Sequence, residues 1–138
     1  MTQEEKNLLE IDYCGRIPHM FGLRAQYNGK DYSPFGYGAG RVPLMTSPIM
    51  SYTSEVPLLE EIKLYLRPLS SMTEKEYEEL KNISGDYGFP PLSNINDWEP
   101  NYAVLDWLNF HFFDYRGLIE KGLALEAPEG MYSFFKKL

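Results

Sequence analysis

Residues 23–32 read Leu23-Arg24-Ala25-Gln26-Tyr27-Asn28-Gly29-Lys30-Asp31-Tyr32, and they predict a β-hairpin. Apolar and polar residues alternate before Asn28, as they do in a strand with one buried face. The dipeptide Asn28-Gly29 favours a two-residue type I′ turn, because both central residues of that turn need a positive φ. Strands near residues 23–27 and 30–33 should therefore pair in an antiparallel arrangement.

The chain beyond the hairpin favours short extended pieces. Prolines and glycines in residues 33–40 exclude a long regular element. Short strands are expected at residues 42–46 and 49–53, at sheet edges, because Pro43 and Pro48 cannot donate a ladder hydrogen bond. Residues 21–68 thus predict a small antiparallel sheet or partial barrel, in which residues 60–66 form one helical turn before Arg67-Pro68.

Helices are predicted on both sides of this β region. An acidic first turn followed by apolar residues is typical of a short helix over residues 3–14, and Pro18 should end it. The sequence Thr73-Glu74-Lys75-Glu76 is a capping box, which predicts a helix from about residue 74 to residue 83.

The strongest helical pattern covers residues 101–113. Its apolar residues, with Trp107, Leu108 and Phe112 among them, fill most of a helical wheel and leave a polar edge at Asp106 and Asn109. A second short helix should follow, capped by Asp114 and closed by Gly122. An extended tail, turning at residues 128–130, should complete the chain.

These elements predict an α+β protein. The chain has 138 residues, 43% of them hydrophobic and 15% aromatic, which is enough for one ordinary core. We expect a single domain over residues 1–138. Residues 1–68 would hold the first helix and the small β module, and residues 69–138 the helical part and the tail.

The distribution of charge and the cysteine content limit the kind of partner and the cellular compartment that we expect. Basic and acidic residues balance at five each in residues 1–53, whereas eight basic residues face fifteen acidic ones beyond them. The acidic part should meet protein, because it repels a polyanion. A single cysteine, Cys14, excludes a disulfide within the chain and fits a reducing compartment. The polar N-terminus and the lack of a long apolar run predict a cytoplasmic location and no membrane contact.

Cations and aromatic rings are interleaved around the hairpin, which is the mixture that binds single-stranded nucleic acid. Rings stack on bases while cations hold phosphates. The simpler interpretation is a tyrosine-rich sheet with ordinary surface charges. The candidate nucleic-acid-binding residues are Arg24, Lys30, Tyr32, Tyr37 and Arg41.

Three patterns bear on catalysis, and each has a structural alternative. Cys14 and His19 could form a nucleophile pair, but a thiol packed as a small apolar side chain explains Cys14 better. His111 and Asp114 could share a helical face as metal ligands, but the sequence offers no third ligand, and a core histidine fits the apolar arc. The glycines of residues 36–40 lack the residues of a phosphate-binding loop. We therefore expect no catalytic residue, no metal and no cofactor.

Two segments carry a family resemblance. They are Leu66-Arg67-Pro68-Leu69-Ser70-Ser71-Met72-Thr73-Glu74 and Asp114-Tyr115-Arg116-Gly117-Leu118-Ile119-Glu120-Lys121-Gly122-Leu123-Ala124-Leu125-Glu126-Ala127-Pro128-Glu129-Gly130-Met131-Tyr132. In these the chain resembles small uncharacterised proteins encoded in bacteriophages and prophages of gut anaerobes. Residues 18–22 depart from the Pro-Tyr-Gly usual in that family. The resemblance implies a bacterial cytoplasm and a mobile-element setting, and it assigns no activity.

Three hypotheses of function follow. The first is a non-enzymatic protein of phage type that binds a protein partner, with self-association as one form of this. The alternative is an accessory protein that binds single-stranded nucleic acid through the β module. The third is a hydrolase or metal enzyme.

Overall fold

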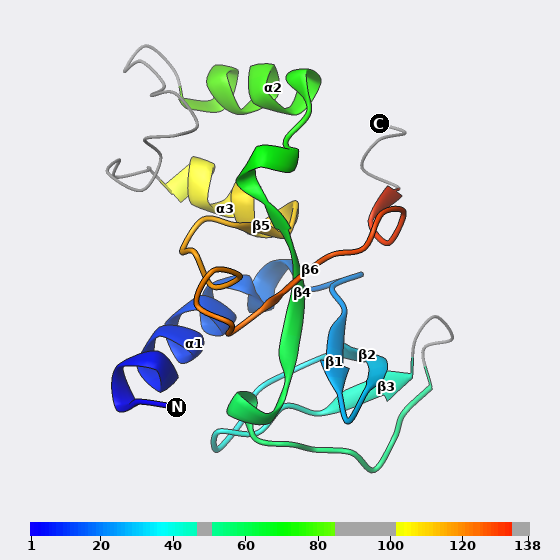
Figure 1. Ribbon diagram of the computed structural model, residues 1–138. Coiled ribbons are helices and arrows are strands. Elements are labelled where there is room, and N and C mark those ends of the chain that lie inside the picture. The colour runs from blue at the N-terminus through cyan, green and yellow to red at the C-terminus, as the bar shows by residue number, and fades with distance from the viewer. Residues whose placement is uncertain (47–50, 85–101, 134–138) are drawn as a thin grey trace.

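The computed structural model describes residues 1–46, 51–84 and 102–133, and the predicted α+β class is confirmed (Figure 1). Six short strands form one open sheet, and helices lie beside and above it. The α-helices are α1 (Gln3–Arg16), α2 (Glu74–Ser84) and α3 (Tyr102–Phe110), and the 3-10 turns are η1 (Ile17–His19), η2 (Leu59–Glu61) and η3 (Leu69–Ser71). The strands are β1 (Ala25–Tyr27), β2 (Lys30–Pro34), β3 (Leu44–Thr46), β4 (Lys63–Pro68), β5 (Phe113–Asp114) and β6 (Leu125–Glu126).

The predicted hairpin is present. Strands β1 and β2 pair antiparallel, with Ala25 opposite Tyr32 and Tyr27 opposite Lys30. Asn28 and Gly29 have φ angles of 52° and 75°, as a type I′ turn requires. Strand β3 continues this meander at the edge of the sheet, which confirms the edge position expected from Pro43. The strand expected at residues 49–53 lies partly outside the described residues, and Tyr52 forms a single bridge to Met45.

Strand β4 is the strand that the sequence analysis missed. A helical turn was expected at residues 60–66, but only η2 is helical, and an extended strand follows it. Leu64, Tyr65, Leu66 and Arg67 are all buried, so β4 is covered on both faces. A strand of this kind shows no alternation of polar and apolar residues, and periodicity alone does not separate it from a buried helix.

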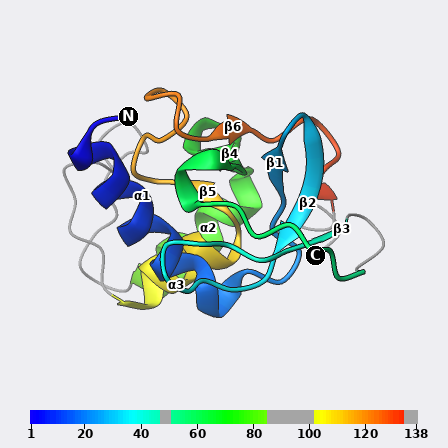
Figure 2. The same ribbon diagram turned by 90° about the horizontal axis from the view of Figure 1, so that it is seen from below.

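The sheet is mixed and open, which corrects the expected antiparallel sheet or partial barrel. Strand β4 pairs antiparallel with β1 and parallel with both β5 and β6. In Figures 1 and 2, α1 lies on one side of β4 and the strands β1 to β3 lie on the other. Strand β4 therefore joins the N-terminal β region to the C-terminal part of the chain.

Helix α1 matches its prediction and ends just before Pro18. Thr2 and Glu5 form a capping box at its start. At its other end the fully buried Arg16 guanidinium donates to both carboxylate oxygens of Asp12, at 2.8 and 3.1 Å. It also donates to the carbonyl of Phe113 at 2.8 Å, so α1 is tied directly to β5.

Helix α2 also matches its prediction. The Glu76 backbone N–H donates to the Thr73 hydroxyl, and the Thr73 N–H donates to the Glu76 carboxylate. The same carboxylate accepts two hydrogen bonds from the Arg67 guanidinium, at 2.7 and 2.8 Å. The capping box thus fixes the start of α2 and also holds the helix against β4.

Helix α3 is shorter than expected, and the prediction of its polar edge is wrong for one residue, Asn109. The helix ends at Phe110, and Phe112 has a φ of 62°, so the chain leaves the helix and enters β5. Asn109 is buried and accepts a hydrogen bond from the Tyr115 hydroxyl at 2.8 Å. Phe110 instead is 51% exposed. Trp107, Leu108 and Phe112 are buried, as predicted.

Turns replace the second C-terminal helix. Asp114 does cap the backbone, because its carboxylate accepts from the N–H groups of Leu118 and Ile119, but the residues up to Lys121 form turns rather than an α-helix. Gly122 has the expected positive φ, at 74°. The end of the expected tail, and residues 85–101 between α2 and α3, lie outside the described residues. None of the helices in the described segments has the length and apolar character needed to cross a lipid bilayer.

Two side chains of α3 should differ sharply in their effect on stability. Trp107→Ala should lower the free energy of unfolding by about 3 to 5 kcal/mol, because Trp107 is 7% exposed and packs on Phe113 and His111. Phe110→Ala, on the same helix, should lower it by less than about 1 kcal/mol, because half of that ring already faces solvent. Urea unfolding of both variants measures this difference. Equal losses would contradict the assigned faces of α3.

Candidate protein interface

The predicted nucleic-acid-binding residues lie on several segments of the chain. Lys30 and Tyr32 belong to β2, on the face of the hairpin that also carries Ala25, and Arg24 directly precedes β1. The Tyr37 ring packs against Tyr13 of α1 at 5.6 Å. Arg41 donates to the Val56 carbonyl at 3.0 Å.

The glycine-rich loop is a tight turn. Gly38 and Arg41 exchange backbone hydrogen bonds of 3.0 and 2.9 Å across Ala39 and Gly40, whose φ angles are 52° and 77°. The Gly38 N–H is therefore used within the turn. The Gly36 carbonyl accepts from the Tyr13 hydroxyl at 2.7 Å, which ties the loop to α1.

Cys14 and His19 have separate surroundings. Cys14 is exposed, so it is not the packed thiol that was expected. Partial desolvation, followed by the charge of Glu10, raises the pKa of its thiol and so disfavours the thiolate. The His19 ring packs edge-to-face on Phe110 at 6.2 Å, and its Nε2 atom lies 3.5 Å from an Asp106 carboxylate oxygen. These contacts direct His19 toward α3.

His111 and Asp114 also have separate roles. The His111 ring is buried and stacks on Trp107 at 4.0 Å, and its Nδ1 atom lies 2.9 Å from the Trp107 carbonyl. Burial lowers the pKa of this imidazole. The Asp114 carboxylate is used in capping Leu118 and Ile119. Among the residues with described positions, no group of three or more His, Cys, Asp or Glu side chains could hold a metal ion.

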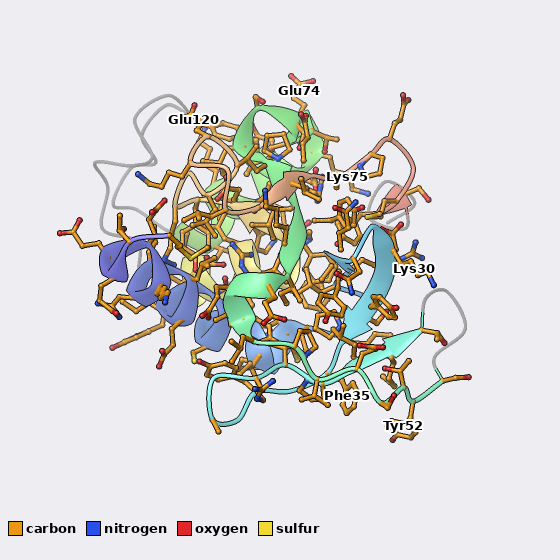
Figure 3. The ribbon with its side chains drawn as sticks, turned by 60° about the horizontal axis from the view of Figure 1, so that its bottom comes forward. Lys30, Phe35, Tyr52, Glu74, Lys75 and Glu120 are labelled. Atoms are coloured by element: carbon orange, nitrogen blue, oxygen red, sulfur yellow. The ribbon has the colours of Figure 1, made fainter. Side chains whose placement is uncertain are left out.

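Exposed aromatic rings instead gather around η1 and the β2–β3 edge. Phe21 is 91% exposed, Tyr52 82% and Phe35 38%. The Phe35 and Tyr52 rings are in edge-to-face contact at 5.5 Å, and Figure 3 shows both projecting from the same end of the molecule. We call this surface the aromatic face and define it by Phe21, Phe35, Tyr52, His19 and Phe110.

A shallow hollow of about 370 Å³ lies between two of these rings, Phe21 and Phe35. Phe21 and Phe35 both line it, and Pro18 and Met20 link it along the chain to His19 and so to Phe110. None of the eight side chains that line the hollow is charged. They are Ile17, Pro18, Met20, Phe21, Ser33, Pro34, Phe35 and Met45.

Each element presents its ring for a local reason. Pro18 is the second residue of the 3-10 turn η1, and Gly22, with a φ of 89°, ends the loop that carries Phe21. Phe35 directly follows β2, where its backbone N–H donates to the Pro43 carbonyl. Tyr52 is held by its bridge to Met45. The rings are thus fixed at the ends of regular elements.

Sequence reasoning missed Phe21 and Tyr52 as surface residues. Phe110 lies within the apolar helical pattern of residues 101–113, so its exposure was not expected. The available signal was that Phe21 is followed by Gly22, and that Tyr52 stands in a segment rich in serine and threonine. Whether these rings are exposed depends on tertiary packing, which the sequence alone does not show.

No protein-family model, no curated protein and no solved structure matches the chain. The resemblance of its two segments to phage proteins therefore stays a prediction.

Burial of His111 predicts a pH-dependent stability. The folded chain lowers the pKa of His111 below its ordinary value of 6.5. The neutral imidazole therefore contributes its full stability above pH 6.5. This contribution is lost as the pH falls, because the unfolded chain takes up the proton at a higher pH than the folded chain does. His111→Asn should flatten the fall in unfolding free energy between pH 6.5 and 4.5, below which Glu76 also titrates. Urea titrations across this range measure it, and an unchanged slope in His111→Asn would refute the assignment.

Proposed function

We propose that this chain is a non-enzymatic protein-interaction protein and that it binds its protein partner through the aromatic face. The observation that supports this most is the exposure of Phe21 and Phe35 at one uncharged hollow, with the exposed Tyr52 ring in contact with Phe35. The resemblance of two segments to phage proteins supports a bacteriophage or prophage setting in a bacterial cytoplasm.

Exposure of these rings is unfavourable for the isolated chain. Burying one aromatic side chain is worth about 1.5 to 3 kcal/mol relative to leaving it in water. Phe21 and Tyr52 realise little of that gain in the folded chain, because they are 91% and 82% exposed. A partner that covered both would recover it. Clustered exposed rings are typical of such surfaces.

The aromatic face also has the chemistry of a protein-binding centre. Aromatic residues and methionine are enriched at the cores of interfaces, where charged residues are depleted. Phe21, Phe35, Met20 and Met45 line an uncharged hollow, and the His19–Asp106 pair lies at one margin. Such a margin can set orientation, while the rings supply most of the affinity.

Binding of single-stranded nucleic acid is the second candidate. Exposed rings such as Phe35 and Tyr52 could stack on bases, and Lys30 is exposed on the hairpin. Figure 3, however, places Lys30 away from these two rings. The net charge of −7 also opposes a polyanion. Protein binding is therefore the proposal that we favour.

The experiment is affinity capture with the full chain from a host lysate, analysed for both protein and nucleic acid. The double variant Phe35→Ser with Tyr52→Ser should lose the partner that the unchanged chain captures, because it removes two adjoining rings. Its melting temperature should stay close to that of the unchanged chain. Ile11→Ser is the matched control, because Ile11 is 60% exposed on α1, outside the aromatic face.

Two results would contradict the proposal. One is a protein partner that the double variant binds as tightly as the unchanged chain. The other is capture of nucleic acid alone, with binding that weakens in Arg24→Ala and Lys30→Ala. That second result would favour the nucleic-acid alternative.

A further inference from the structure

We infer that the partner of the aromatic face is a second copy of this chain, docked about a twofold axis with the Phe21 ring of each copy in the hollow of the other. This inference rests on the proposed function and specifies it. It is carried by the shape, the size and the charge of the face.

The shape is self-complementary. Phe21 projects almost fully into solvent, at 91% exposure, beside a hollow of about 370 Å³. A projecting ring and a hollow on the same face are what a twofold interface needs, since each copy offers the same patch to the other. The hollow is wide enough to admit a phenyl ring and is lined by apolar side chains such as Met20 and Met45. Flexible methionines adapt readily to an inserted ring.

The exposed area is large enough for a specific contact. A fully exposed phenylalanine or tyrosine side chain presents about 200 Å². At the exposures of Phe21, Phe35, Tyr52 and Phe110, the rings alone offer about 500 Å² per copy. Two copies would bury about 1,000 Å², which is where specific interfaces begin, before the lining of the hollow is counted.

The distribution of charge favours this face over other faces for contact between two copies. Each chain carries a net charge of −7, so two copies repel one another over most orientations. No charged side chain lines the hollow, and at its margin His19 lies beside Asp106. Glu74 and Glu120 lie at the opposite end of the molecule from Phe35 and Tyr52 (Figure 3). Docking through the aromatic face therefore keeps these carboxylates far apart.

Sedimentation velocity of the purified full chain, from low to high micromolar concentration, tests this inference. The unchanged chain should sediment as a dimer at the higher concentrations. Phe21→Ser should raise the dissociation constant about 30-fold or more, as loss of a central interface ring does. Phe21→Trp should retain the dimer, because it keeps an aromatic ring at the same place. Circular dichroism melts would show that both variants fold.

Ile11→Ser, an equally simple loss of an exposed apolar side chain on α1, should leave the dissociation constant unchanged. Sedimentation as a monomer at every concentration would overturn the inference, and so would a dimer that Phe21→Ser leaves intact. A monomeric chain whose capture of a different protein still needs Phe35 and Tyr52 would overturn the second copy as partner. That result would leave the proposed function standing.

Discussion

Phe113 is held between two buried arginines that come from distant parts of the chain. Arg16 of α1 donates to its carbonyl at 2.8 Å, and the Arg67 guanidinium of β4 lies 4.2 Å from the centre of its ring. Each arginine has its own carboxylate, Asp12 and Glu76 respectively. Removing one member of a buried pair costs about 3 to 5 kcal/mol, because the other charge is left uncompensated. The arrangement of α1, α2, β4 and β5 therefore depends on both pairs being complete.

This arrangement gives structural roles to residues of the two segments that resemble phage proteins. Arg67 and Asp114 lie within them, and their side chains pair with Glu76 and cap a backbone turn. Their polar atoms are used inside the molecule. The aromatic face, in contrast, is built from η1 and the loop after it, the segments that follow β2 and β3, and the last residue of α3. Its rings contribute little to the two apolar cores, so they are available to a partner.

Local signals in the sequence predicted local structure well. Asn28-Gly29 and the capping box at Thr73 fix backbone conformation over a few residues, so the hairpin and α2 were readable. Strand β4 was not, because a strand buried on both faces loses its alternation. The end of α3 was not readable either, because the positive φ of Phe112 is imposed by the entry into β5. The aromatic face depends on which rings find no apolar neighbour, and that is decided by packing between distant segments.

We propose that the aromatic face is the binding surface and that β4 with its neighbours is the stable interior. Amide hydrogen exchange measured by mass spectrometry, on the chain alone and on the chain bound to its partner, a second copy included, tests this most directly. We predict that binding newly protects residues 17–22, 33–36 and 51–53 from exchange, whereas exchange in residues 64–67 is slow and unchanged. Protection confined to the hairpin tip or to α2, with none at Phe21 or Tyr52, would contradict it.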